Sequence, residues 1–131
     1  MSNFIPQGAS HVIAQAIDAF ETTQKLPLGT ILSAVDNSSA ALGSGEFVYL
    51  QGVASTVLGS VVVYNADDYS TTLAVANAIG PVAVAMSISV ANTYAWYQIS
   101  GKGSAKVLAS FADNANCYLT STAGSIDDAI V

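Results

Sequence analysis

The chain has 131 residues, of which 52% are hydrophobic and only 9% are charged, and its nine acidic residues and three lysines give a net charge of −6. Three lysines are too few to replace the counterions of a phosphate backbone. We therefore expect no nucleic-acid binding and no binding to an anionic membrane. An ordinary soluble domain is about 25% charged. The low charge predicts extensive burial against other subunits, because obligate interfaces resemble a domain core; a monomer with a neutral polar surface is the alternative.

The first part of the chain differs in pattern from the rest and predicts two units. Residues 1–40 are expected to form an extended N-terminal arm, and residues 41–131 a β domain. The opening stretch, Met1 to Pro6, has neither the basic region nor the long apolar core of a secretion signal. We therefore expect synthesis in a cytoplasm-like compartment without export.

A short helix is predicted within the arm, between His11 and Phe20. Its apolar residues have the spacing of one helical face; they are Ile13, Ala16, Ile17 and Phe20. A helix of about ten residues is marginal in water by itself. The arm is therefore expected to dock on another surface.

The following chain predicts short strands separated by turn residues. The expected strands are 30–35, 46–51, 60–64, 71–75, 81–90, 93–100, 104–109 and 116–121. Residues 81–90 alternate larger apolar side chains with Ala and Ser, which is the period of a strand. Gly101-Lys102-Gly103 is expected to be a hairpin turn. This pattern predicts an all-β fold, a small antiparallel sandwich or barrel, whose edges need closing or pairing.

The residues of common catalytic and metal sites are too few or too scattered to predict an enzyme, a metal site or a cofactor. A nucleophile needs a base beside it, but the single His11 and the single Cys117 lie far apart in the sequence. Cys117, in an alternating apolar run, is expected to be buried and inert. Two acid pairs, 67–68 and 127–128, lack the alternation of a calcium loop and are expected to be turn residues. Nothing in the spacing pairs Glu46 with another carboxylate for sugar hydrolysis.

Three neighbouring aromatic residues, Tyr94, Trp96 and Tyr97, leave three interpretations open. They can form the core, a subunit contact or a stacking platform for sugars, because aromatic side chains serve all three roles. The alternation places Tyr94 and Trp96 on one face of the strand and Tyr97 on the other.

Four segments resemble, in the same order, a family of tailed-bacteriophage capsid decoration (cement) proteins and related head structural proteins. They are GEFVYLQGVAST at 45–56, GPVAVAMS at 80–87, NTYAWYQISG at 92–101 and TAGSIDD at 122–128. The resemblance covers roughly residues 28–131. Ala95 stands where the family usually has glycine, and the relatives tend to continue beyond Val131.

The resemblance implies a non-enzymatic protein on the outer surface of a virion's icosahedral capsid, bound to the major capsid protein and associated as a homotrimer. We expect the capsid and subunit contacts to involve apolar arm residues and the aromatic strand, namely Phe4, Ile5, Ile13, Ile17, Phe20, Tyr94, Trp96 and Tyr97. A phage head fibre or host-glycan-binding β module is the alternative function.

Overall fold

The computed structural model describes residues 4–6, 16–36, 42–112 and 115–128. These residues contain strands and loops and no helix, so the prediction of an all-β, mostly antiparallel fold is confirmed for this part of the chain. The strands are β1 (Phe4–Pro6), β2 (Phe20–Glu21), β3 (Ile31–Asp36), β4 (Ser44–Gln51), β5 (Val61–Tyr64), β6 (Thr71–Leu73), β7 (Val82–Ala85), β8 (Tyr94–Gly101), β9 (Tyr118–Leu119) and β10 (Ile126–Asp127).

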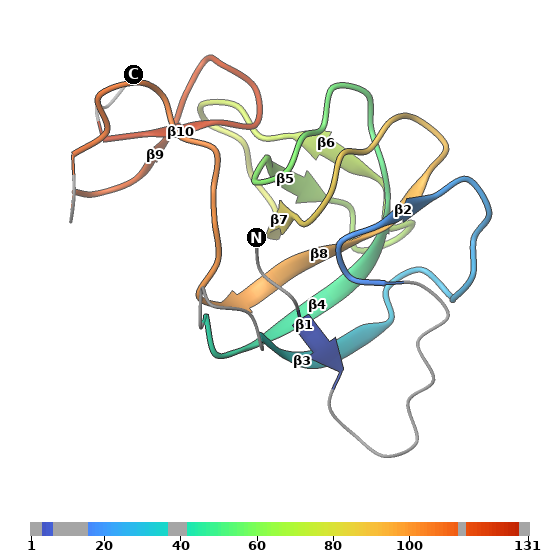
Figure 1. Ribbon diagram of the computed structural model, residues 1–131. Helices are drawn as coiled ribbons and strands as arrows, with labels where there is room; N and C mark the ends of the chain where they lie inside the picture. Colours follow the sequence, from blue (N-terminus) through green and yellow to red (C-terminus); the bar gives the residue numbers. More distant parts are fainter. Residues whose placement is uncertain (1–3, 7–15, 37–41, 113–114, 129–131) are drawn as a thin grey trace.

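One large antiparallel sheet contains eight of these strands, in the order β1-β3-β4-β8-β7-β5-β6, with β2 paired to β8. Figure 1 shows β1, β3 and β4 at one side of this sheet and β5, β6 and β7 at the other. The short pair β9–β10 lies beside the sheet as a separate hairpin-like unit (Figure 1).

The two long strands β4 and β8 lie at the centre of the large sheet. They pair along their whole length, from Gly45 opposite Gly101 to Gln51 opposite Tyr94, with one register shift at Glu46/Phe47. The other edge of β8 pairs with β7 and, nearer its start, with β2. Both edges of β8 are therefore occupied.

The sheet is buried on both faces, because alternate residues of β4 and β8 point to opposite sides. One core contains Phe47, Tyr49 and Trp96, and the other contains Leu50 and Tyr97. All five of these side chains are almost completely buried. This explains why the central strands are nearly continuous in apolar and aromatic residues.

The sheet curls until its last strand meets the end of β4. Gln51 forms a parallel bridge with Ser70, and its N–H donates to the Tyr69 carbonyl at 3.1 Å. The Thr71 hydroxyl donates to the Gln51 carbonyl at 2.7 Å. Strands β4, β8, β7, β5 and β6 thus surround the core that contains Tyr97.

The predicted boundary at residue 40 does not separate the described arm residues from the sheet. β3 pairs with β4 from Ile31 to Val35, β1 pairs with β3, and β2 pairs with β8. Leu26 and Leu28 pack against the core that contains Trp96. Ile17, Leu32 and Ala34 belong to that core, so residues 17–36 complete the domain by covering the outer face of its central strands.

Part of the predicted helix, residues 11–15, lies outside the described residues. Its described end is a turn, in which the Ala19 N–H donates to the Ala16 carbonyl at 3.3 Å, followed by the short strand β2. Pairing with Ala95 and Tyr94, on the part of the β8 edge that β7 does not occupy, favours an extended backbone at Phe20 and Glu21.

The predicted strand 104–109 is wrong, since only Val107 makes an isolated bridge there, with Ile126. A hairpin strand after β8 would need a free edge of β8, and both edges are taken by other strands. The chain instead leaves through a turn fixed by Gln98, whose amide donates to the carbonyls of Ser100 and Lys102 at 3.0 and 2.8 Å. The Lys106 N–H then donates to the Gly59 carbonyl at 2.7 Å.

Gly52, which follows β4, lies in a closely packed region at the end of this strand. Its N–H donates to the Thr93 carbonyl at 2.7 Å, and a Cβ here would overlap the Ser89 hydroxyl and lie 2.9 Å from the Val90 carbonyl. We predict that Gly52→Ala lowers the free energy of unfolding by about 3 kcal/mol, because overpacking forces a buried segment to shift. Urea denaturation measures this loss.

The matched control is Gly43→Ala, because a Cβ at Gly43 meets nothing within 4 Å although its φ is +77°. Its cost is backbone strain alone, about 1 kcal/mol. Equal losses in the two variants would show that steric overlap is not what requires glycine at residue 52.

Candidate interaction surface

The aromatic strand lies mainly inside the chain's own core. Trp96 is 1% exposed and Tyr97 is 0% exposed, whereas Tyr94 is half-buried. Trp96 packs against Tyr49 with ring centroids 5.1 Å apart, and Tyr94 stacks on Tyr49 at 6.5 Å. The core interpretation therefore holds for Trp96 and Tyr97, and of the three aromatic residues only Tyr94 has surface to offer a partner.

The phenol groups of Tyr49 and Tyr97 are held neutral by their surroundings. Burial raises the pKa of Tyr49, although the Lys25 backbone N–H, which donates to its phenol oxygen at 3.3 Å, lowers that pKa in part. Burial likewise raises the pKa of Tyr97, with partial compensation by nearby Ser and Thr hydroxyls. Both groups are structural, because they lie in the two cores and not at an opening to solvent.

The arm residues divide into core, surface and residues whose side chains are not described. Phe4 and Ile5 lie in β1 opposite Asp36 and Val35, and Ile13 lies outside the described residues. Ile17 is 3% exposed and belongs to the Trp96 core. Its side chain is therefore not available to a partner. Phe20 is 43% exposed, and of the arm residues predicted to make contacts it is the one whose described side chain can reach a partner.

Phe20 borders an apolar cavity of about 420 Å³, a volume typical of binding pockets. Most of the side chains that line this cavity are apolar, and they are Phe20, Leu42, Leu58, Met86 and Ile88. Ser87 also lines it, and its buried hydroxyl has no hydrogen-bond partner among the described groups. Asp18 is the only charged residue of the described lining. We call this space the Phe20 cavity.

In the segment 82–90, small residues lie inside and most of the larger ones outside, with the exception of Met86, which is buried in the Trp96 core. Ala83 and Ala85 are buried against the Tyr97 core, whereas Val82, Ile88 and Val90 are each about half exposed. The alternation in the sequence predicted two faces but could not show that the larger residues point outward. Ala83 and Ala85 share one core with the large, fully buried side chain of Tyr97.

Several residues of this surface were missed by sequence reasoning, and the signal for them was weak. Leu58 is 51% exposed and lines the Phe20 cavity, yet it stands in a short loop between β4 and β5 with no periodic pattern around it. Met86 and Ile88 were part of a predicted strand that in fact ends at Ala85. Their place at the cavity follows from how the chain turns after β7.

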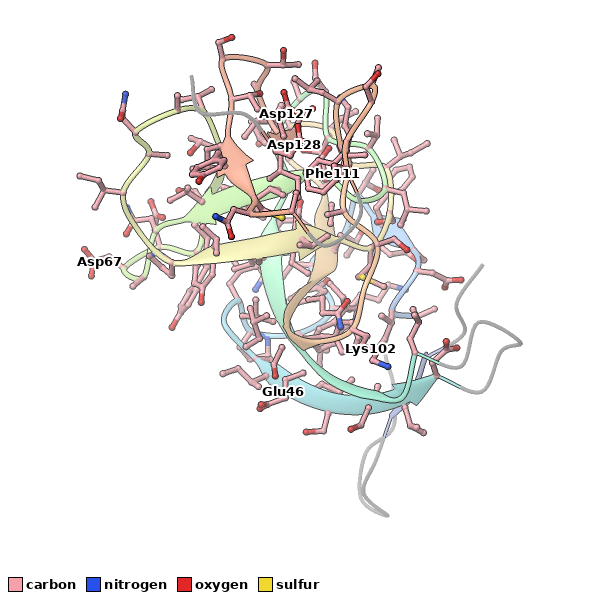
Figure 2. All side chains as sticks on the ribbon, turned by 90° about the vertical axis from the view of Figure 1, so that its left-hand side faces the viewer. Glu46, Asp67, Lys102, Phe111, Asp127 and Asp128 are labelled. Atoms are coloured by element: carbon pink, nitrogen blue, oxygen red, sulfur yellow. The ribbon has the colours of Figure 1, made fainter. Side chains whose placement is uncertain are left out.

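The charged residues of the described chain do not converge on one site. Figure 2 shows Glu46 at the opposite end of the molecule from Asp127 and Asp128, so these carboxylates share no site. Among the described residues, no group of three His, Cys, Asp or Glu side chains is placed to hold a metal ion.

The acid pairs act in turns and loops. The Asp68 carboxylate accepts hydrogen bonds from the Ser70 N–H and hydroxyl at 3.0 and 2.7 Å, which lower its pKa. The Asp128 carboxylate accepts one from the Ala112 N–H at 3.0 Å. The prediction for Cys117 is wrong, because its thiol is exposed in the loop before β9.

Comparisons with protein-family models, curated proteins and solved structures found no match. In the described part of the chain, no helix has the length and apolarity that crossing a bilayer requires. The arguments about function therefore depend on the chain's own residues.

The buried phenol of Tyr97 predicts a loss of stability in alkali. Its pKa is raised in the folded state, so the folded protein holds this proton more tightly than the unfolded chain, whose tyrosines ionise near pH 10. The stabilisation is complete below that pH and is lost as the pH rises above it. We predict that the free energy of unfolding of Tyr97→Phe at pH 7 lies within about 1 kcal/mol of the wild-type value. Between pH 9 and pH 11, roughly the range around the tyrosine pKa, the variant should lose less of this free energy than the wild type.

Denaturant titrations across this pH range make the comparison. Tyr49→Phe, which removes the other raised phenol pKa, should reduce the same loss, and the double variant should reduce it further. If Tyr97→Phe loses as much free energy of unfolding as the wild type over this pH range, the loss does not come from the Tyr97 phenol.

The different burial of Ile17 and Phe20 predicts different effects of the same substitution. Ile17→Asp places a carboxylate in the Trp96 core and should cost about 3 kcal/mol or more. Phe20→Asp changes a half-exposed side chain and should cost about 1 kcal/mol. Thermal unfolding followed by Trp96 fluorescence measures both, and similar losses would show that the two residues are not packed as described.

Proposed function

We propose that this chain is a non-enzymatic virion protein that binds the outer surface of a phage capsid, contacts the major capsid protein and stabilises the shell as a homotrimer. The observation that carries the proposal is the collinear resemblance of four segments, spanning residues 45–128, to capsid decoration proteins. Synthesis in the host cytoplasm and residence on the outer surface of the virion belong to the same proposal.

The surface of the described chain supports a role in assembly. Its exposed large apolar side chains include Phe20, Leu58 and Ile88, which all line the Phe20 cavity. Exposed apolar patches on soluble proteins mark interaction sites. Only 9% of the chain is charged, so few charges have to be desolvated when such a surface is covered.

The alternative of a glycan-binding module depended on aromatic stacking and is less well supported. Trp96 and Tyr97 are buried between strands and could stack on a sugar only if the core opened. Tyr94 alone, already stacked on Tyr49, offers a small platform. We therefore retain capsid binding as the proposed function.

Two measurements on virus particles test this function. A mass-spectrometric census of purified particles should find the chain at a fixed ratio close to that of the major shell protein, whereas its absence would overturn the proposal. Co-sedimentation with capsids that lack the chain should then show binding, and Phe20→Asp should weaken that binding at least tenfold. Ile31→Asp, an exposed apolar residue on β3 away from the Phe20 cavity, is the matched control and should bind normally.

A further inference from the structure

The loop between β6 and β7 displays one apolar side chain almost entirely to solvent. Ile79 is 94% exposed, the highest value among the large hydrophobic residues of the described chain. The loop around it is fixed, because the Ala76 N–H donates to the Thr120 carbonyl at 2.9 Å and the Tyr64 N–H donates to the Pro81 carbonyl at 3.0 Å. Ile79 is therefore held outward by its backbone, and we call it the apolar knob.

The knob and the Phe20 cavity lie at opposite ends of β7. Ile79 precedes the strand by three residues, and the lining residues Met86, Ser87 and Ile88 follow it directly. The four residues of β7 advance the chain by about 13 Å. Ile79 is not part of the cavity lining, so a knob that fills this cavity has to come from a second molecule.

The knob end of the molecule is acidic. Ile79 shares a shallow depression with Ala66 and Ser70. Asp67 and Asp68 lie between those two residues in the sequence, and both are exposed. Residues 63–81, which include the whole described lining of this depression, contain Asp67 and Asp68 and no lysine.

The cavity end carries two of the chain's three lysines. Lys102 immediately precedes the lining residues Gly103 and Ser104. Lys106 is joined through its N–H to the carbonyl of Gly59, which follows the lining residue Leu58. Figure 2 shows Asp67 and Lys102 on opposite sides of the molecule. The two ends thus carry opposite charges, with Asp18 as the one acid among the described lining residues of the cavity.

We propose that copies of this chain associate head to tail, with Ile79 of one copy inserted into the Phe20 cavity of the next. The inference deepens the proposed function and rests on its self-associating role. A contact between two different surfaces is heterologous and either closes into a ring or extends. It buries the knob, Leu58 and Ile88, and it offers the Ser87 hydroxyl the backbone groups of the incoming loop as hydrogen-bond partners.

Mixing two variants of the purified protein tests this contact without any capsid. Ile79→Asp removes the knob and keeps the cavity, whereas Leu58→Asp places a carboxylate in the apolar lining of the cavity and keeps the knob. Each variant alone should sediment as a monomer at a concentration at which the wild type is oligomeric. An equal mixture retains one intact contact per pair and should give a dimer. The two variants have the same mass, so one of them is isotope-labelled. Native mass spectrometry of the mixture should then show a dimer with one copy of each variant.

Folding of each variant is checked by circular dichroism, and Ile31→Asp, which changes an equally apolar exposed residue on β3, should remain oligomeric. The proposal is overturned if the wild type is monomeric, if Ile79→Asp stays oligomeric, or if the mixture stays monomeric. If Leu58→Asp remains oligomeric, the cavity does not hold the knob of a second copy, and its occupant is a small apolar molecule or another part of the same chain. That result also overturns the proposal. If a monomeric variant still binds capsids, the proposed function holds and the head-to-tail contact is not needed for it. If the wild type is oligomeric but does not bind capsids, the contact holds and the proposed function fails.

Discussion

Strand β8 is the element on which the other parts of this protein depend, because it is buried on both faces and paired on both edges. Trp96 anchors one core, Tyr97 anchors the other, and between them the strand leaves no face for a ligand. β4 follows it on one edge, while β7 and β2 share the other. Contacts with a partner therefore have to be made by the peripheral strands and the loops.

The same constraint explains the chain's unusual surface. Strand β7 turns its two alanines into the core that contains Tyr97 and leaves Val82 about half exposed on the outside. Since both edges of β8 are taken, the chain after Gly101 crosses to Gly59 and brings two lysines to the cavity end. The apolar and charged features of the surface are thus consequences of how the two cores are packed.

Much of the β structure was predictable from the sequence, because period-two alternation and turn residues are local signals. The strands at 46–51, 60–64 and 93–100 were expected close to their observed bounds. The integration of residues 17–36 was not, because docking of Ile17 and Leu28 on the Trp96 core is a long-range contact. The candidate surface was harder still, since neither the exposure of Ile79 nor the grouping of Leu58 with Phe20 has a local pattern that distinguishes it from core.

The pairing of β4 with β8 has a consequence for how the chain is made. The inner end of the central pair is Gln51 opposite Tyr94, so the pair closes a loop that comprises residues 52–93, and such non-local pairings form slowly. A nascent chain that has not yet released β8 from the ribosome carries Phe47, Tyr49 and Leu50 without the strand that covers them. The domain can reach its native state only when nearly all of it has been synthesised, and its apolar segments depend on protection from aggregation until then.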